Sequence, residues 1–415
     1  MNDSEQIFDL NETAAEKEFA SYEAEYDYGK VIDRSGTYSM KWDDGNEILP
    51  FWVADMDIVC SPAIVEAINK RAESPIYGYT DIPDEWANAY SSWFQSEHGW
   101  NLQPEELIYT NGIICGLSSM VRRFSVPHEK VIVMTPVYPI FFNSIVNNGR
   151  EPLEVPLAYS SDDRSYAIDF EALKAAMEDP QASLMILCNP HNPTGNLWSK
   201  EELNRIADLA EANGVLIISD EVHCDIVRPG YAYTPFASVS EKAAMNAISL
   251  LSPSKAFNVA GIHTAAAAAY NPVIRHRAWR AINTDEVGEP NVFSIQTAIA
   301  AYTKSLDWLK GLQAYLFENR DYAVSFIESE MKLLSCIRAD ALYLLWIDAS
   351  ELPGMPEDFV DFLCENFQIR LSSGTDFKGN GESFIRMNLA CPKSMLEEGL
   401  RRFKAGYQKW IEIHQ

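Results

Sequence analysis

One lysine of the chain, Lys255, directly follows a run of apolar residues. The stretch AISLLSPSK begins at residue 247 and carries Leu250 and Leu251 into a short polar turn that ends in this lysine. Such a run predicts a buried strand, so the ammonium group is expected where that strand stops. A lysine that is partly desolvated among apolar neighbours has a lowered pKa and becomes a nucleophile toward carbonyl groups. The placement therefore indicates chemistry at Lys255.

Four other motifs follow apolar runs in the same way: TNGIICGLSSMV from residue 110, TPVYP from 135, CNPHNPTGN from 188 and SDEVHCD from 219. The free backbone amides of the turn at Gly112 suit a phosphate, although an ordinary strand-to-helix turn has the same pattern. Tyr138 either stacks on a flat ring or belongs to the core. Asn192 lies between prolines that fix the direction of its amide, although a plain loop has such prolines too.

The last of these motifs supplies two titratable groups, Asp220 and His223. Asp220 either caps a helix or stays ionised to hold a cation, and His223 taken alone is typical of a structural histidine. Together, a phosphate cradle, a stacking tyrosine, a directed asparagine, a buried acid and a nucleophilic lysine match the outline of pyridoxal 5'-phosphate (PLP). This combination is far more specific than any one member, so it predicts a PLP site.

The elements that must position these residues are short apolar runs separated by helical or loop segments. Seven such runs lie between Leu107 and Asn271, and they predict a mostly parallel sheet covered by helices on both faces. Ligands of open α/β sheets bind at the strand ends, where the motifs lie. A smaller α+β unit is predicted to close the chain, from a long helical pattern over 305–334, strands over 342–348, 367–373 and 384–390, and a final helix.

The length of 415 residues favours two domains. We expect an acidic N-terminal extension over residues 1–25, because acidic residues dominate this stretch and it has too few large apolar residues for a core. A large PLP-binding α/β domain is expected over 65–299, and a smaller α+β domain over 26–64 and 300–415.

Composition excludes several classes of partner. The formal net charge of -27 repels nucleic-acid phosphates and anionic lipids, so binding to nucleic acid or a membrane is not expected. The N-terminus opens with acids where a secretory signal needs a basic start and an apolar core. The seven cysteines are scattered and never spaced as CxxC, which predicts neither a disulfide framework nor a metal site. We expect a cytoplasmic protein.

The motifs resemble those of the fold-type I PLP-dependent enzymes, the aminotransferase class I/II superfamily. Within it, the chain is most similar to the cystathionine β-lyase and cysteine carbon-sulfur lyase subgroup, on the stretches FWVADMD, YGYT, SDEVHCD, SPSKAFNVAG and FIRMNLACP. The likeness runs from about Tyr26 to Lys393. It implies a large domain with a seven-stranded, mostly parallel sheet and a smaller α+β domain.

The resemblance also implies a role for each site residue. For the cofactor, it assigns the Schiff base to Lys255, the pyridinium partner to Asp220, the phenolate donor to Asn192, ring stacking to Tyr138, and phosphate contacts to Gly112, Ile113, Ile114 and Ser252. Arg386 resembles the arginine that grips the substrate α-carboxylate with its planar fork, beside Tyr138. The chain departs from the aminotransferase pattern at His223, where a tyrosine is usual but which is common in the lyase-like subgroup, and at His263, where an arginine usually binds the phosphate.

The activity that the resemblance implies is PLP-dependent β-elimination. An S-substituted cysteine such as L-cystathionine would give a thiol, pyruvate and ammonia. Lys255 serves transamination equally well, so an L-amino-acid aminotransferase is the alternative, and a regulatory or binding protein on a PLP fold is a third possibility. Tyr79 in YGYT resembles the tyrosine that reaches the phosphate of the neighbouring subunit, which predicts a homodimer with shared active sites.

Overall fold

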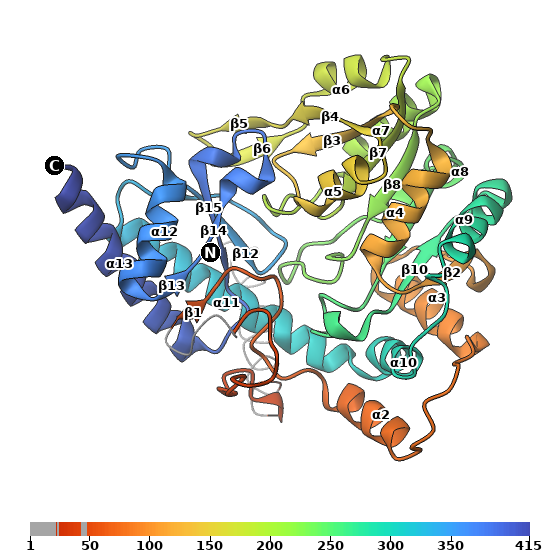
Figure 1. Cartoon of the computed structure of the whole chain (residues 1–415), viewed down its shortest axis with the longest axis horizontal. Coiled ribbons are helices and arrows are strands. Elements are labelled where there is room, and N and C mark those ends of the chain that lie inside the picture. The colour runs from red at the N-terminus through yellow and green to blue at the C-terminus, as the bar shows by residue number, and fades with distance from the viewer. Residues whose placement is uncertain (1–21, 23–24, 43–47) are drawn as a thin grey trace, which may run out of the picture.

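A seven-stranded sheet forms the centre of the molecule (Figure 1). The structure is a computed structural model that describes residue 22, residues 25–42 and residues 48–415, so nearly all of the predicted acidic extension over residues 1–25 lies outside the described residues. The strands, in the order β2-β10-β9-β8-β7-β3-β4, span Leu107–Thr110 (β2), Ala265–Ala268 (β10), Ala247–Leu251 (β9), Leu216–Asp220 (β8), Ala182–Cys188 (β7), Lys130–Thr135 (β3) and Glu151–Pro156 (β4).

Each of the seven apolar runs of the sequence supplies one strand of this sheet. Neighbouring strands are parallel except around β10, which pairs antiparallel with both β9 and β2. The predicted α/β fold class with a seven-stranded, mostly parallel sheet is therefore confirmed. Because β2 runs opposite to β10, and β10 opposite to β9, β2 has the direction of the parallel strands. The carboxyl ends of β2, β3, β7, β8 and β9 consequently meet at one edge of the sheet.

Helices cover both faces of the sheet because successive strand residues point to opposite faces. In β3, Val131 and Val133 pack on one face, and Ile132 and Met134 on the other. The first face is covered by α4 (Ile113–Phe124), α5 (Ile140–Val146) and α9 (Pro272–Thr284), and the second by α6 (Phe170–Met177), α7 (Lys200–Asn213) and α8 (Glu241–Met245). This double cover explains why the strands are apolar throughout.

A second, antiparallel sheet lies to one side, where Figure 1 draws the chain in blue. Its strands, in the order β11-β12-β15-β14, are Ser335–Cys336, Leu344–Asp348, Phe384–Asn388 and Ser372–Ser373. It packs with α11 (Leu306–Glu330), α12 (Pro356–Phe367) and α13 (Lys393–His414). The strand predicted over 367–373 is divided: β13 (Ile369–Arg370) pairs with β1 (Leu49–Pro50), whereas β14 pairs with β15.

The remaining elements surround these two sheets. Helices α2 (Pro62–Ala72), α3 (Asp84–His98) and α10 (Ser294–Lys304) pack together beside β2 and β10. A hairpin is formed by β5 (Ala158–Ser160) and β6 (Ser165–Ala167), and short 3-10 turns cover Pro104–Glu106, Phe236–Ser238, Ala260–Ile262, Gly374–Phe377 and Gly381–Ser383. Of the helices in the described part of the chain, none combines the length and apolarity that crossing a bilayer requires.

Candidate active site

A cavity of about 230 Å³ opens at the edge where the carboxyl ends of the parallel strands meet. Every residue predicted to bind the cofactor lines it except Tyr79: Gly112, Ile113, Ile114, Tyr138, Asn192, Asp220, His223, Ser252 and Lys255. The five motifs follow five different strands, and the sheet order brings them together. Tyr79 lies in the stretch between α2 and α3 and is 99% exposed, so it is not part of this cavity.

Lys255 lies four residues beyond the end of β9, in the turn that the sequence predicts. Its ammonium group donates a hydrogen bond to the Ala54 carbonyl at 2.8 Å. Burial, together with the nearby Arg386 cation, lowers the pKa of Lys255 to about 8, although Asp55 and Asp220 act in the opposite direction. At neutral pH about a tenth of the side chain is then free amine, far more than for an ordinary lysine, and the free amine is the form that a nucleophile or base needs.

Asp220 is the last residue of β8 and is almost fully buried. The Val222 amide donates a hydrogen bond to its carboxylate at 3.2 Å. Burial raises the pKa of Asp220 to about 7, although the Val222 hydrogen bond and the Lys255 cation oppose the shift. A cationic ring nitrogen beside this carboxylate would favour its ionised form.

His223 follows in the loop after β8, and its imidazole is buried. Burial and the cations of Lys255 and Arg386 lower the pKa of His223 well below its usual range. The ring is therefore neutral, and its Nδ1 atom has no hydrogen-bond partner among the described residues. A buried ring nitrogen of this kind in a cavity wall is suited to a polar group of a ligand.

The phosphate cradle is the N-terminus of α4. Gly112 precedes the first helical turn with φ = 136°, a backbone angle that favours glycine. No side chain caps this end of the helix, so its first amides are free to bind an anion. Ser252 is already engaged, since its hydroxyl donates to the Thr264 carbonyl at 2.7 Å. Its proton is therefore used within the protein, although Ser252 lines the cavity.

Asn192 and Tyr138 form further parts of the wall. The Asn192 side-chain oxygen accepts a hydrogen bond from the Arg386 guanidinium at 3.3 Å. Tyr138 is partly buried, and its ring meets Phe141 edge-on, with the centroids 5.7 Å apart. Because Tyr138 also lines the cavity, its ring is suited to contact with a flat group there.

Arg386 does not itself line the cavity but adjoins it through Asn192. It lies on β15 in the antiparallel sheet, is only 6% exposed, and donates to the Trp52 carbonyl at 2.9 Å. Burial lowers its pKa to about 10. No carboxylate of the described residues lies within ion-pair distance, and Nε has no hydrogen-bond partner there. A buried guanidinium without a counter-ion is suited to the carboxylate of a substrate.

Sequence reasoning missed several groups of this site. Asn111, Cys115, Ser254 and Thr264 also line the cavity, as does His263. The Ala54 carbonyl that accepts from Lys255 carries no side-chain signal at all, so residue patterns could not reveal it. Ser254 lies within the quoted SPSK motif and could have been considered as a phosphate contact.

One group of possible metal ligands among the described residues lies outside the cavity, at His98, Cys224 and Asp225. His98 shares a short hydrogen bond of 2.7 Å with Asp225, which also accepts from the Trp93 indole at 3.0 Å. Burial and the Asp225 carboxylate raise the pKa of the Cys224 thiol well above its usual range. Because a metal binds the thiolate, we interpret this group as a structural hydrogen-bond cluster.

The cavity as a whole offers the groups that PLP requires. Free helix amides face a phosphate, a ring can lie against Tyr138, a buried carboxylate can pair with a cationic nitrogen, and Lys255 can bond an aldehyde. Among the described residues, His223 Nδ1 in the cavity wall and Arg386 Nε next to the cavity have no hydrogen-bond partner, so both can bind a polar group of a ligand. The residues therefore fit this cofactor.

Comparison with known proteins adds independent evidence. The profile of the family "Aminotransferase class I and II" matches residues 48–403. Cystathionine beta-lyase PatB of Bacillus subtilis is 36% identical, over 91% of this chain and 99% of that protein. A PLP-bound putative aminotransferase from Clostridium difficile superposes with a TM-score of 0.89 at 34% identity, covering 92% of this chain and 100% of that one. Cystalysin from Treponema denticola, which contains PLP, gives 0.89 at 31% identity, covering 92% and 99%.

Proposed function

Because the chain belongs to the aminotransferase class I and II family, we propose that it is a PLP-dependent carbon-sulfur β-lyase. It cleaves L-cystathionine or another S-substituted cysteine with one water, and releases a thiol, pyruvate and ammonium. The observation that carries the proposal is the convergence of Lys255, Asp220 and the α4 amides on one cavity beside the unpaired Arg386. The choice of a lyase rests on the similarity to PatB along nearly its whole length.

The cofactor is held by residues from five strand ends. The α4 amides would receive its phosphate, and Tyr138 would lie against its ring. Asp220 would pair with its ring nitrogen, Asn192 with its phenolate oxygen, and Lys255 would bond its aldehyde carbon. When bound, PLP withdraws electrons from the Cα atom of an amino acid, which makes the Cα proton acidic and lets a Cβ substituent depart.

The chain's own residues bind the substrate and move the proton. Arg386 receives the α-carboxylate through two parallel hydrogen bonds, which aligns the rest of the substrate. The Lys255 amine takes the proton from Cα, for which its lowered pKa suits it. The bond between Cβ and sulfur then breaks, and sulfur leaves with the electron pair as a thiolate that is later protonated. Asp220 stays ionised next to the ring cation throughout.

The test is the release of pyruvate from L-cystathionine by the purified PLP-loaded protein without an added keto acid. Lactate dehydrogenase with NADH measures pyruvate, and a thiol reagent measures homocysteine in a one-to-one ratio. An aminotransferase would instead need a keto acid and would form no pyruvate from cystathionine. That result would overturn the lyase in favour of the alternative function.

We also propose a homodimer in which Tyr79 completes the site of the partner. The exposure of Tyr79, with exposed Ile76 and Tyr77 beside it, supports this proposal, because large apolar side chains gather at interfaces. Tyr79→Ala and Lys255→Ala should each be inactive alone. Mixed after denaturation and refolding, they should regain up to about a quarter of the wild-type activity, through heterodimers with one intact site. No recovery would contradict the shared site.

The same protein is proposed to be cytoplasmic. All seven cysteines are unpaired, and four of them are buried, which is usual in a reducing compartment. Fractionation of the cells that produce it would test this location.

A further inference from the structure

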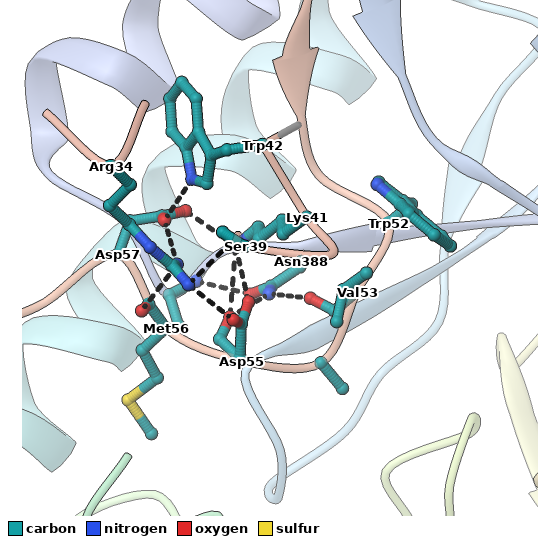
Figure 2. Close-up of polar contacts among 12 residues, drawn as sticks. Arg34, Ser39, Lys41, Trp42, Trp52, Val53, Asp55, Met56, Asp57 and Asn388 are labelled. Atoms are coloured by element: carbon teal, nitrogen blue, oxygen red, sulfur yellow. Dashed lines mark hydrogen bonds and ion pairs between the residues drawn. The ribbon is translucent and has the colours of Figure 1, made fainter. Parts of the chain in front are cut away.

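The segment between β1 and α2 connects the two cations of the site. We name residues 52–58 the strap (Figure 2). Its Ala54 carbonyl accepts from the Lys255 ammonium at 2.8 Å, and its Trp52 carbonyl accepts from the Arg386 guanidinium at 2.9 Å. Main-chain atoms only two residues apart thus hold both groups. The place of the strap therefore sets the spacing between the lysine and the arginine.

Two asparagines bind the strap to the elements that carry these cations. Asn388 donates to the carbonyls of Val53 at 2.6 Å and Asp55 at 2.7 Å, and it lies two residues after Arg386 on the same face of β15. Asn258, three residues after Lys255, donates to the carbonyls of Met56 at 3.1 Å and Ile58 at 2.8 Å. The strap is therefore fixed from both sides through its backbone.

Two strap carboxylates bind cations from the preceding segment. Asp57 pairs with Arg34 at 2.7 Å and with Lys41 at 2.6 Å, and it accepts from the Trp42 indole at 2.7 Å. Asp55 pairs with Arg34 at 2.9 Å and with Lys41 at 3.4 Å. Figure 2 shows these side chains converging above the strap.

Asp57 is the more deeply placed of the two acids. The Asp57 and Lys41 side chains are 5% and 1% exposed, whereas the Asp55 side chain is 24% exposed. Burying such a pair carries a large desolvation cost, and apolar replacements of similar volume are often as stable. A contribution to the free energy of unfolding is therefore a weak explanation for the Asp57–Lys41 pair. A role in fixing the position of the strap explains it better.

Resting on the function proposed above, we propose that Asp57 is a positioning residue, which locks the strap where the Ala54 carbonyl meets the amine of Lys255. It touches neither substrate nor cofactor. It acts through Arg34, Lys41 and Trp42, which hold it from the side away from the cavity. In the FWVADMD motif, backbone carbonyls therefore contact the two cations of the site, whereas the carboxylates of Asp55 and Asp57 pair with Arg34 and Lys41 and fix the position of that backbone.

The test compares Asp57→Asn and Trp42→Phe with the wild type, all as full-length PLP-loaded protein. The readouts are the circular dichroism of the bound cofactor band, kcat and KM for L-cystathionine, PLP content and melting temperature. Asp57→Asn should lower kcat about tenfold, because a small displacement of the lysine misaligns proton transfer. It should also raise KM, since Arg386 shifts with Trp52, and alter the dichroism. Trp42→Phe should change the same quantities in the same direction by about threefold.

Trp410→Phe is the matched control. It also removes one indole donor, here to the Pro353 carbonyl at 2.8 Å near the end of α13, and should lower only the melting temperature. Unchanged dichroism, kcat and KM in folded, PLP-loaded Asp57→Asn and Trp42→Phe would overturn the proposal, as would equal changes in the control. If Asp57→Asn does not fold, the results for Trp42→Phe alone test the positioning role of Asp57. The circular dichroism of the cofactor band requires only bound PLP. It therefore tests whether the strap positions Lys255 even if the protein does not cleave cystathionine.

Discussion

Replacing Arg386 with methionine should separate the function of this residue from its effect on stability. Burial lowers the pKa of the Arg386 guanidinium from its ordinary value to about 10, which corresponds to a penalty of about 3 kcal/mol for the buried charge. Methionine of similar length removes this penalty. It also removes the hydrogen bonds to Asn192 and Trp52, at about 1.5 kcal/mol each. The two effects nearly cancel, so the free energy of unfolding should change by no more than about 1 kcal/mol.

Activity should respond very differently to Arg386→Met. The substrate carboxylate loses two charge-assisted hydrogen bonds, worth at least about 3 kcal/mol together, so kcat/KM should fall by about two orders of magnitude or more. The assay is pyruvate release over a range of cystathionine concentrations, alongside urea unfolding followed by circular dichroism. A substrate whose carboxylate is an amide should be cleaved equally poorly by the wild type and the variant.

Arg320 provides the matched control for this experiment. It is 2% exposed, burial lowers its pKa also to about 10, and it donates to the carbonyls of Leu344 and Ile337, each at 3.2 Å, away from the cavity. Arg320→Met should have a similar small effect on unfolding and leave kcat/KM unchanged. The reasoning is refuted if Arg386→Met keeps normal kcat/KM, or if it loses more than about 3 kcal/mol of stability while Arg320→Met does not.

Three further predictions concern the cofactor. Lys255→Ala should lower pyruvate release by about 10³-fold or more while the protein still binds PLP, as absorbance would record; retained turnover would exclude Lys255 as the base. Burial raises the pKa of Asp220 from 3.8 to about 7, so the cofactor-free protein should lose stability as pH rises from about 4 to about 7. The loss of melting temperature over this range should be smaller in Asp220→Asn, in which the buried Glu221, whose pKa burial also raises, still contributes; an unchanged slope would refute the assignment. Gly112→Ala should weaken PLP binding about tenfold, because alanine is strained at φ = 136°; equal affinity in a fluorescence titration would contradict the cradle.

The large sheet was predictable because its strands are buried on both faces. A run such as AISLL, which became β9, has only the small Ser249 among apolar residues and no alternation that would suit a solvated face, so local pattern alone identifies it. The antiparallel direction of β10 was not predictable, since four alanines carry no signal of orientation. The division of 367–373 into two strands was missed for a related reason: pairing partners distant in sequence decide it. The domain boundaries at residues 65 and 300 stay a prediction.

The site was predictable where its residues follow a strand and could be recognised by type. Lys255, Asp220 and Asn192 each lie in a motif that directly follows a strand, and the sheet brings these motifs together at one edge. Contacts made by backbone atoms could not be predicted, and Ala54 lies 201 residues before the lysine that it binds. The partner of a hydroxyl could not be predicted either, because the Ser252 hydroxyl donates to the Thr264 carbonyl, twelve residues further along the chain.

The two cations of the site are coupled, so that binding of a substrate carboxylate at Arg386 should change the pKa of Lys255. Burial first, and then the Arg386 cation, lowers the pKa of Lys255, while Asp55 and Asp220 raise it. A carboxylate bound to Arg386 neutralises that cation. The pKa of the Lys255 nitrogen should therefore rise when a substrate carboxylate arrives. Its basicity increases, and the fraction of free amine at neutral pH decreases.

This coupling can be measured by titrating the absorbance band of the bound cofactor with pH. Saturating 3-(methylthio)propanoate has the carboxylate of a substrate without its amine, and it should move the midpoint to higher pH. The corresponding amide should leave the midpoint in place. In Arg386→Met the midpoint should already lie higher than in the wild type, and the carboxylate should no longer move it. An equal shift with acid and amide would show that desolvation by the bound ligand, rather than the charge on Arg386, controls the lysine.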